Sequence, residues 1–182
     1  MKDIEIKSRV DLVPISEEDT DLIVKWRNSP SVQNNFIFRE PFTKEMHEGW
    51  LKNKVATGKV IQFMIVERES GRKIGSTYLR DIDKLYKSAE YGIFIGEDDV
   101  RGKGFGTEAA VKIVQYGFNR LHLHRIFLRV FEKNLQAINS YLHAGFLIEG
   151  VARDMVFLEG EFHNILFMSQ INQDDYCFEE MI

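Results

Sequence analysis

The chain has little cysteine and no long apolar run. It carries one cysteine, Cys177, among 182 residues, so no intramolecular disulfide can form, and no CxxC spacing offers thiolates to zinc. No stretch approaches the roughly 18 uninterrupted apolar residues of a membrane span, and the start, MKDIEIKSRVDLVP, lacks the apolar block of a secretion signal. We therefore expect a cytoplasmic protein with no metal site and no membrane partner.

The chain also has no excess of basic residues over acidic ones. The 24 Lys and Arg residues are outnumbered by 28 Asp and Glu residues, which gives a net charge of −4. A nucleic-acid surface would need a clustered basic face, so we expect no nucleic-acid partner. With 44% hydrophobic residues the chain can bury one sizeable core but is too short for two. We therefore expect a single domain over residues 1–182.

The apolar residues along the chain follow alternating strand and helix periods. Runs of period two predict strands, spacings of three and four predict helices, and residues 29–42 are expected to form an irregular loop. The order is strand, two helices, three strands, helix, strand, helix and two strands, which indicates a mixed α/β or α+β sheet with one strand-helix-strand crossover. The expected strands are 9–15, 60–68, 73–82, 88–96, 125–131 and two runs within 155–171; the expected helices begin after Ser16, at Thr43 (burying Met46, Trp50 and Leu51), at Thr107 and at Asn134.

A glycine-rich stretch, RGKGFG at 101–106, lies between an expected strand and an expected helix. Glycines let a backbone approach a ligand closely, and the first N–H groups of a helix present the positive end of its dipole. Such a site suits a phosphate or pyrophosphate, and Arg101 and Lys103 add positive charge beside it. A glycine-rich turn without a ligand is the alternative.

Two familiar phosphate motifs do not fit this stretch. A P-loop needs Ser or Thr after its GK pair, but Gly104 follows Lys103. The dinucleotide fingerprint fits Gly102 and Gly104 but finds Thr107 where its third glycine belongs, and about 90 residues precede the crossover. Both nucleotide folds are therefore disfavoured.

The stretch resembles the signature of a known family. Arg101-x-x-Gly104-x-Gly106 is similar to the R/Q-x-x-G-x-G/A motif of the GNAT superfamily of acetyl-CoA-dependent N-acetyltransferases. NLQAINSYLHAGF at 134–146 resembles the family helix N-x-x-A-x-x-x-Y-x-x-x-G-F, and 26–32 and 151–171 look like the branch of ribosomal-protein, spermidine and certain amino-sugar acetyltransferases. The resemblance implies a mixed, twisted sheet of about six to seven strands with splayed central strands and about four helices.

The resemblance implies acetyl-CoA as co-substrate and places it along three segments. The main chain of 93–95 would bind the pantetheine arm, and the N–H groups of 101–106 would cradle the pyrophosphate. Asn134 would face the cofactor, although asparagine is also a good helix N-cap. The implied cofactor-binding residues are Ile93, Phe94, Ile95, Arg101, Gly102, Lys103, Gly104, Phe105, Gly106 and Asn134.

The resemblance also implies two catalytic side chains. Glu90 matches a catalytic glutamate that takes a proton from the amine, directly or through a water, although a glutamate on an open strand face is the plainer interpretation. Tyr141 matches a tyrosine that protonates the departing sulfur; the alternatives are a core tyrosine, or Ser140 in that role. A phenol is protonated at neutral pH, which suits an acid.

The resulting hypothesis is acetyl transfer from acetyl-CoA to a primary amine, directly and within a ternary complex. The acceptor is a small-molecule amine or a protein N-terminus, chosen by residues 26–42 and the 153–163 turn. Aromatics with carboxylates would suit a polyamine, whereas Arg27 and Asn28 would suit an acidic or sugar-nucleotide acceptor. A non-catalytic acyl-CoA-binding domain is the rival, and a homodimer is possible. The candidate acceptor contacts are Trp26, Arg27, Asn28, Phe36, Phe38, Glu40 and Glu161.

Overall fold

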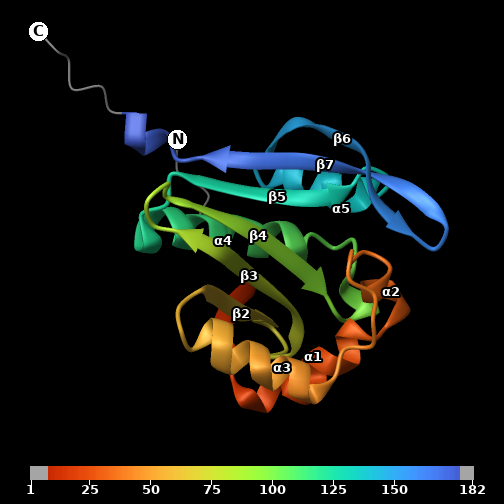
Figure 1. The fold of residues 1–182 in the computed structure, drawn as a ribbon. Coiled ribbons are helices and arrows are strands. Elements are labelled where there is room, and N and C mark those ends of the chain that lie inside the picture. Colours follow the sequence, from red (N-terminus) through yellow and green to blue (C-terminus); the bar gives the residue numbers. More distant parts are fainter. Residues whose placement is uncertain (1–7, 177–182) are drawn as a thin grey trace, which may run out of the picture.

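A seven-stranded mixed sheet organises the computed structural model, which describes residues 8–176 (Figure 1). The strand order is β1-β2-β3-β4-β5-β7-β6. The strands are β1 Val10–Pro14, β2 Val60–Glu67, β3 Lys73–Asp83, β4 Ser88–Ile95, β5 Arg125–Phe131, β6 Leu147–Leu158 and β7 Glu161–Ile171. The α-helices are α1 Thr20–Arg27, α2 Pro30–Gln33, α3 Lys44–Trp50, α4 Phe105–Leu121 and α5 Leu135–His143. Short turns of other helix types are η1 Glu17–Asp19, η2 Leu51–Val55, η3 Asp98–Val100 and η4 Gln173–Tyr176. Cys177 lies outside the described residues.

The two faces of the sheet are covered by different helices. Along β4 the side chains alternate, so Ala89 and Tyr91 pack against α4 in one core cluster, whereas Phe94 packs with Trp26 of α1 in another. Figure 1 shows α4 running along the central strands and α1 and α3 gathered at the β2 and β3 end. Glu90 and Gly92 alternate with the first set and therefore share the α1 face with Phe94.

The central strands separate part of the way along their length. β4 and β5 are a parallel pair joined through α4, but their register runs only from Ser88 opposite Arg125 to Glu90 opposite Phe127. Beyond Glu90, β4 continues to Ile95 and β5 to Phe131 without pairing with each other. The splayed central strands and the mixed sheet are thus confirmed. The expectation of a single crossover was wrong, because β5 and β6 both run antiparallel to β7 and are joined through α5 in a second strand-helix-strand crossover.

Three local expectations were wrong. The stretch 29–42 contains α2, which Pro30 starts because its fixed φ suits a first helical position. Met46 is 39% exposed, and the buried position on α3 belongs to His47, whose Nδ1 lies 2.9 Å from Thr20 Oγ1. β6 begins at Leu147 rather than near 155, because two register shifts against β7 interrupt the period-two pattern.

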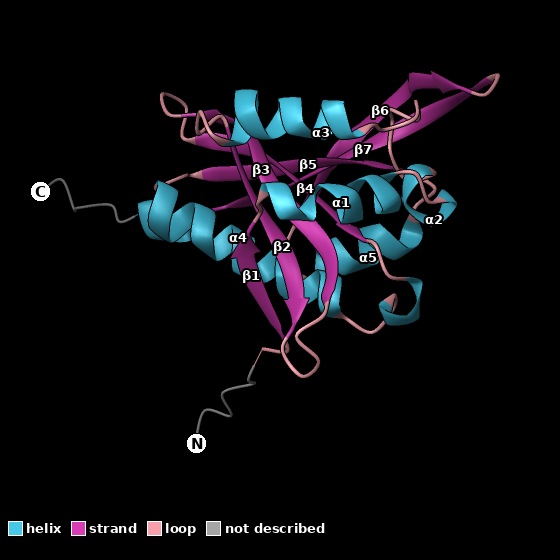
Figure 2. Cartoon of the chain, turned by 90° about the horizontal axis from the view of Figure 1, so that it is seen from below, coloured by secondary structure: helices cyan, strands magenta, loops and turns pink. Residues whose placement is uncertain are grey.

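The β6–β7 hairpin projects past the rest of the sheet, as Figure 2 shows. β6 is one of the two edge strands of the sheet, and most of its side chains are exposed. No helix among residues 8–176 has the length and apolar character needed to span a membrane.

Candidate active site

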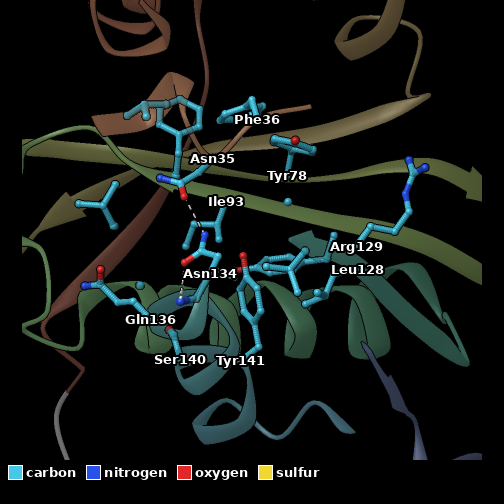
Figure 3. Close-up of a pocket in the computed structure, with 18 of the residues that line it drawn as sticks. Asn35, Phe36, Tyr78, Ile93, Leu128, Arg129, Asn134, Gln136, Ser140 and Tyr141 are labelled. Carbon is cyan, nitrogen blue, oxygen red and sulfur yellow. Dashed lines mark hydrogen bonds between the residues drawn. The ribbon is translucent and has the colours of Figure 1, made fainter. Parts of the chain in front are cut away.

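A cavity of about 780 Å³ lies where β4 and β5 separate. Its lining includes Glu90 and Gly92 from the α1 face of the sheet and Ile93 from the α4 face. Thr107 of α4 and Tyr141 of α5 line it as well. Figure 3 shows side chains entering it from above and below β4. The splay therefore connects the two faces of the sheet through a single space.

The glycine-rich stretch forms one end of this cavity. Gly102 and Gly104 have φ values of 73° and 88°, which L side chains rarely adopt. Gly104 is the N-cap of α4, and no side chain caps this helix. Within the described residues, the N–H groups of 102–106 donate to no backbone carbonyl. The loop thus offers unpaired donors at a helix N-terminus, which fits a phosphate.

Arg101 differs from the other loop residues because its side chain holds the fold together. Its guanidinium donates to the carbonyls of Ser31, at 3.0 Å, and of Ile95, and Nε lies 2.9 Å from Asp98 Oδ1. Its backbone N–H donates to the carbonyl of Asp98 at 3.2 Å. Lys103 is exposed. The positive charge expected from Arg101 is therefore already paired by Asp98.

One edge of β4 is open beside the cavity. β4 pairs with β3 as far as Ile95, but on the β5 side its last pair is Glu90 with Phe127. Backbone groups from 91 onward on that edge therefore have no partner strand, and an extended ligand can add there as a strand would. The Phe94 side chain lies on the α1 face of β4, with its ring centroid 6.2 Å from that of Trp26 and 5.9 Å from that of Phe36.

Asn134 serves as the N-cap of α5. Its Oδ1 accepts the N–H of Ala137 at 3.1 Å, and its Nδ2 donates to Asn35 Oδ1 at 2.9 Å (Figure 3). Asn134 also lines the cavity. The structure therefore shows the N-cap, and a contact of Asn134 with the cofactor stays a prediction.

Tyr141 reaches the cavity from α5. Figure 3 shows its hydroxyl directed toward β4, between Asn134 and Leu128. The ring packs 5.9 Å from Tyr91 and 6.0 Å from Phe146. Burial, with a smaller effect of Tyr78, raises the pKa of the Tyr141 hydroxyl well above its usual value. The group is therefore a proton-bearing donor at neutral pH. Ser140, the alternative, shares a hydrogen bond of 2.8 Å with Thr107.

Glu90 is buried between two arginines that the sequence analysis did not identify. Arg80 donates from Nε to Oε2 at 3.2 Å, and its Nη2 forms an ion pair with Oε1 at 2.9 Å; Arg129 donates to both oxygens at 3.0 and 3.1 Å. Burial alone would raise the pKa of the Glu90 carboxyl, but the hydrogen bonds from Arg129 and Arg80 outweigh it and lower this pKa below its usual value. Glu90 is thus an ionised carboxylate whose two oxygens are both paired with arginine.

The acceptor contacts expected from the sequence are only partly brought together. Arg27, Phe36 and Phe38 line the cavity. Trp26 is 1% exposed in the core, with Nε1 donating to Glu97 at 2.8 Å. Asn28 binds the backbone of Phe42 instead. Neither Asn28, Glu40 nor Glu161 lines the cavity, and no residue of the 153–163 turn does so. The lining residues that the sequence analysis missed include Trp50, Gln62, Tyr78, Arg80 and Arg129.

Comparisons with known proteins agree with this arrangement. Residues 9–147 match the acetyltransferase (GNAT) domain family. The chain is 31% identical over 170 residues to the spermidine N(1)-acetyltransferase of Escherichia coli K12, covering 93% of this chain and 89% of that one. It is 30% identical over 104 residues to a putative ribosomal N-acetyltransferase of Bacillus subtilis, covering 57% and 56%.

The fold is also that of a solved relative. The crystal structure of a Vibrio cholerae spermidine N-acetyltransferase with CoA and spermine superposes with a TM-score of 0.83 at 24% identity, covering 91% of this chain and 96% of that one. The resemblance inferred from the glycine-rich signature is confirmed. The chain belongs to the GNAT acetyltransferase family and is an acetyl-CoA-dependent N-acetyltransferase.

Proposed function

We propose that this enzyme transfers acetyl directly from acetyl-CoA to a primary amine, with the two substrates meeting in the splay between β4 and β5. One observation carries the proposal: a single cavity joins the α4 and α5 face to the α1 and α3 face through that splay. Among residues 8–176 the cavity lining offers no cysteine that could carry an acetyl group, and Cys177 lies outside this range.

The chain's own residues fit the cofactor on the α4 face. The N–H groups of 102–106 would hold the pyrophosphate, and the open edge of β4 from 91 to 95 would hold the pantetheine arm. Bound acetyl-CoA supplies an acetyl thioester to this space. Asn134, at the N-terminus of α5, would keep the arm against β4.

Tyr141 would hold a proton for the departing sulfur. Its raised pKa keeps the hydroxyl protonated, so Oη donates a hydrogen bond at all physiological pH values. A thiol is a stronger acid than this phenol, so complete proton transfer is unfavourable and the hydrogen bond itself would stabilise the developing negative charge. Tyr141 would therefore act as a donor to sulfur.

Removal of the amine proton is the harder step for these residues. An alkyl amine has a pKa of about 10, and a general base works best with a pKa near the working pH. The Glu90 carboxylate has a lowered pKa and is hydrogen-bonded by Arg80 and Arg129 at both oxygens. The base role predicted for Glu90 therefore requires that one arginine release it.

The relatives make polyamines the first acceptors to test. Two of the proteins that this chain resembles are spermidine N-acetyltransferases, and the solved one is a complex with spermine. The experiment is CoA-thiol release from acetyl-CoA with polyamines, amino sugars and N-terminal peptides, with CoA binding measured by calorimetry in parallel. Amine-dependent thiol release supports the proposal; CoA binding without release by any amine would favour a non-catalytic domain.

We also propose that the enzyme self-associates through the β6–β7 hairpin. A spermidine N-acetyltransferase from Vibrio cholerae forms a dodecamer. In this chain β6 is an edge strand that pairs only with β7 among the described strands, and the projecting hairpin exposes large apolar side chains of the kind that interfaces bury. Light scattering should give more than one chain per particle, and replacing Phe157 and Phe162 with serine should reduce that number. The exposed apolar residues are Leu147, Ile148, Val151, Met155, Phe157 and Phe162.

A further inference from the structure

We propose that the acceptor amine also carries an anionic group, a phosphate or a carboxylate, which Arg27 binds. The proposal rests on the proposed function, because it specifies the acceptor of the same cavity. Three features of the α1 face support it: the contacts of Arg27, the charges that line the cavity, and the position of Tyr78.

Arg27 is a half-buried cation without an anionic partner. Its guanidinium lies 3.5 Å from the ring centroid of Phe36 and 5.1 Å from that of Phe42, and it lines the cavity. Among residues 8–176 it makes no hydrogen bond and no ion pair. Burial lowers the pKa of Arg27, with a smaller opposing effect of Tyr78. Burying a cation is costly unless an anion pairs with it, so the site is suited to a negative ligand.

The other cavity arginines already have carboxylate partners. Arg80 and Arg129 share Glu90, and Arg101 pairs with Asp98. Arg27 is therefore the cavity arginine whose guanidinium fork remains available to a ligand. A planar fork stacked on aromatic rings is well suited to a carboxylate or phosphate, which it can bind through two parallel hydrogen bonds.

The charges of the lining disfavour a polycation. Within residues 8–176, four arginines line the cavity, Glu90 is the only carboxylate that does so, and no aspartate or lysine lines it. Both oxygens of Glu90 are already paired with arginine. The nearby Glu159 lies outside the cavity and pairs with Arg39 at 2.8 Å. A polyamine would thus meet like charges with little compensation, whereas an anionic group would be attracted.

Tyr78 supplies a second donor on the same face. It lies opposite Gly92 in the β3–β4 register, and a side chain at Gly92 would place its Cβ 2.3 Å from Tyr78 Cζ. The missing side chain thus lets the ring lie against β4, within electrostatic range of Arg27. Burial raises the pKa of the Tyr78 hydroxyl, which therefore remains a donor. It makes no hydrogen bond with any residue in the described range.

The anion at Arg27 is distinct from the phosphates of the cofactor. The expected pyrophosphate site is the N-terminus of α4, and α4 packs on the face of β4 opposite to α1. Saturating the protein with CoA would therefore fill the phosphate site at 102–106 and leave Arg27 free. This separation allows the two anion sites to be tested independently.

The experiment is calorimetric binding of matched amines to CoA-saturated protein. The pairs are glucosamine 6-phosphate with glucosamine, and 5-aminopentanoate with pentylamine; spermidine is the polycation. We expect the anionic member of at least one pair to bind about tenfold or more tightly than its neutral partner and than spermidine, as one ion pair would give. The pair that shows the preference identifies phosphate or carboxylate as the anion.

Two variants test whether Arg27 causes the preference. Arg27→Gln should abolish it, whereas Lys25→Gln, an equal charge change at an exposed position of the same helix, should preserve it. CoA affinity reports whether each variant is folded, and if Arg27→Gln does not fold, the comparison in the wild-type protein decides alone. Neutral amines or spermidine binding as tightly as both anionic amines would overturn the inference, as would a preference that survives in folded Arg27→Gln. Acetylation of any amine upholds the proposed function in either case.

Discussion

Arg129 donates two hydrogen bonds to the carboxylate of Glu90, from Nε at 3.0 Å and from Nη2 at 3.1 Å. The contact joins β5 to β4 at Glu90, the last residue of β4 that pairs with β5. Arg80 binds the same carboxylate from β3, so one buried anion links three strands just before the sheet splits. The geometry of the point where β4 and β5 separate therefore depends on Glu90, whatever part Glu90 takes in proton transfer.

Replacing Glu90 with Gln distinguishes a catalytic base from a residue that only links the strands. If Glu90 is the base, kcat/KM for the amine should fall by about 10²–10⁴-fold. The lowered pKa of Glu90 keeps the carboxylate ionised through the neutral range, so the shape of the pH profile above about pH 5 should not change. Glu149→Gln, which removes an ion pair with Arg125 outside the cavity, is the control. A fall in kcat/KM of less than about tenfold would exclude Glu90 as the catalytic base.

Replacing Tyr141 with Phe should lower kcat by about 10²-fold and leave CoA affinity unchanged. The ring contacts with Tyr91 and Phe146 survive this change, and only the hydroxyl is lost. Single-turnover rates and CoA calorimetry would measure the two quantities. Tyr116→Phe, in a ring packed 5.2 Å from Phe63 and outside the cavity, is the matched control. Unchanged turnover in Tyr141→Phe would exclude its hydroxyl from catalysis.

Replacing Gly104 with Ala should raise the KM for acetyl-CoA. The position has a φ of 88°, and an added Cβ would lie 3.1 Å from Arg9 Nη2. Gly160→Ala is a close control, because Gly160 has a φ of 85° in the β6–β7 turn and open space around it. Both variants should lose about 1–2 kcal/mol of stability from the left-handed backbone. Cofactor affinity should fall only in Gly104→Ala, and an equal affinity in both variants would contradict the phosphate site.

The acid side of the stability curve should depend on Glu149. Hydrogen bonds from Arg125 and Ser169 lower the pKa of Glu149 to about 2, with burial opposing them. The unfolded chain has the ordinary higher value, so this carboxylate stabilises the fold above about pH 4.5 and loses that contribution as the pH falls toward 2. Chemical denaturation at several pH values should show a smaller decline for Glu149→Gln than for the wild type. A decline of unchanged size would contradict the assignment, and exposed Glu69→Gln is the control.

Features encoded by neighbouring residues could be predicted from the sequence. The glycine loop, the N-cap at Asn134 and the tyrosine on α5 each follow from short spacings, so their positions were expected. The splay was implied by the family signature and is visible in the register, which ends at Glu90 and Phe127. Local spacing alone was sufficient to place the glycine loop and α5, and the contacts of their residues with the cofactor stay predictions.

The arrangement of charges on the α1 face of the cavity depends on pairing between distant strands. Arg80 meets Glu90 only because β3 and β4 adopt one register, and Arg129 joins them only through the parallel pairing of β5. The sequence alone does not show which residues surround Glu90. It therefore cannot reveal that Arg80 and Arg129 pair with both carboxylate oxygens. Likewise, the structural role of Arg101 depends on its contact with Ser31, 70 residues earlier in the chain.

The most direct test of acetyl transfer through the splay is the initial rate of CoA-thiol release, measured while acetyl-CoA and an amine are both varied. Direct transfer in a ternary complex predicts amine-dependent release with intersecting double-reciprocal lines and no acetylated protein. Parallel lines with an acetylated enzyme would contradict direct transfer. Release that no amine of the panel stimulates, in protein that still binds CoA, would contradict the proposed activity.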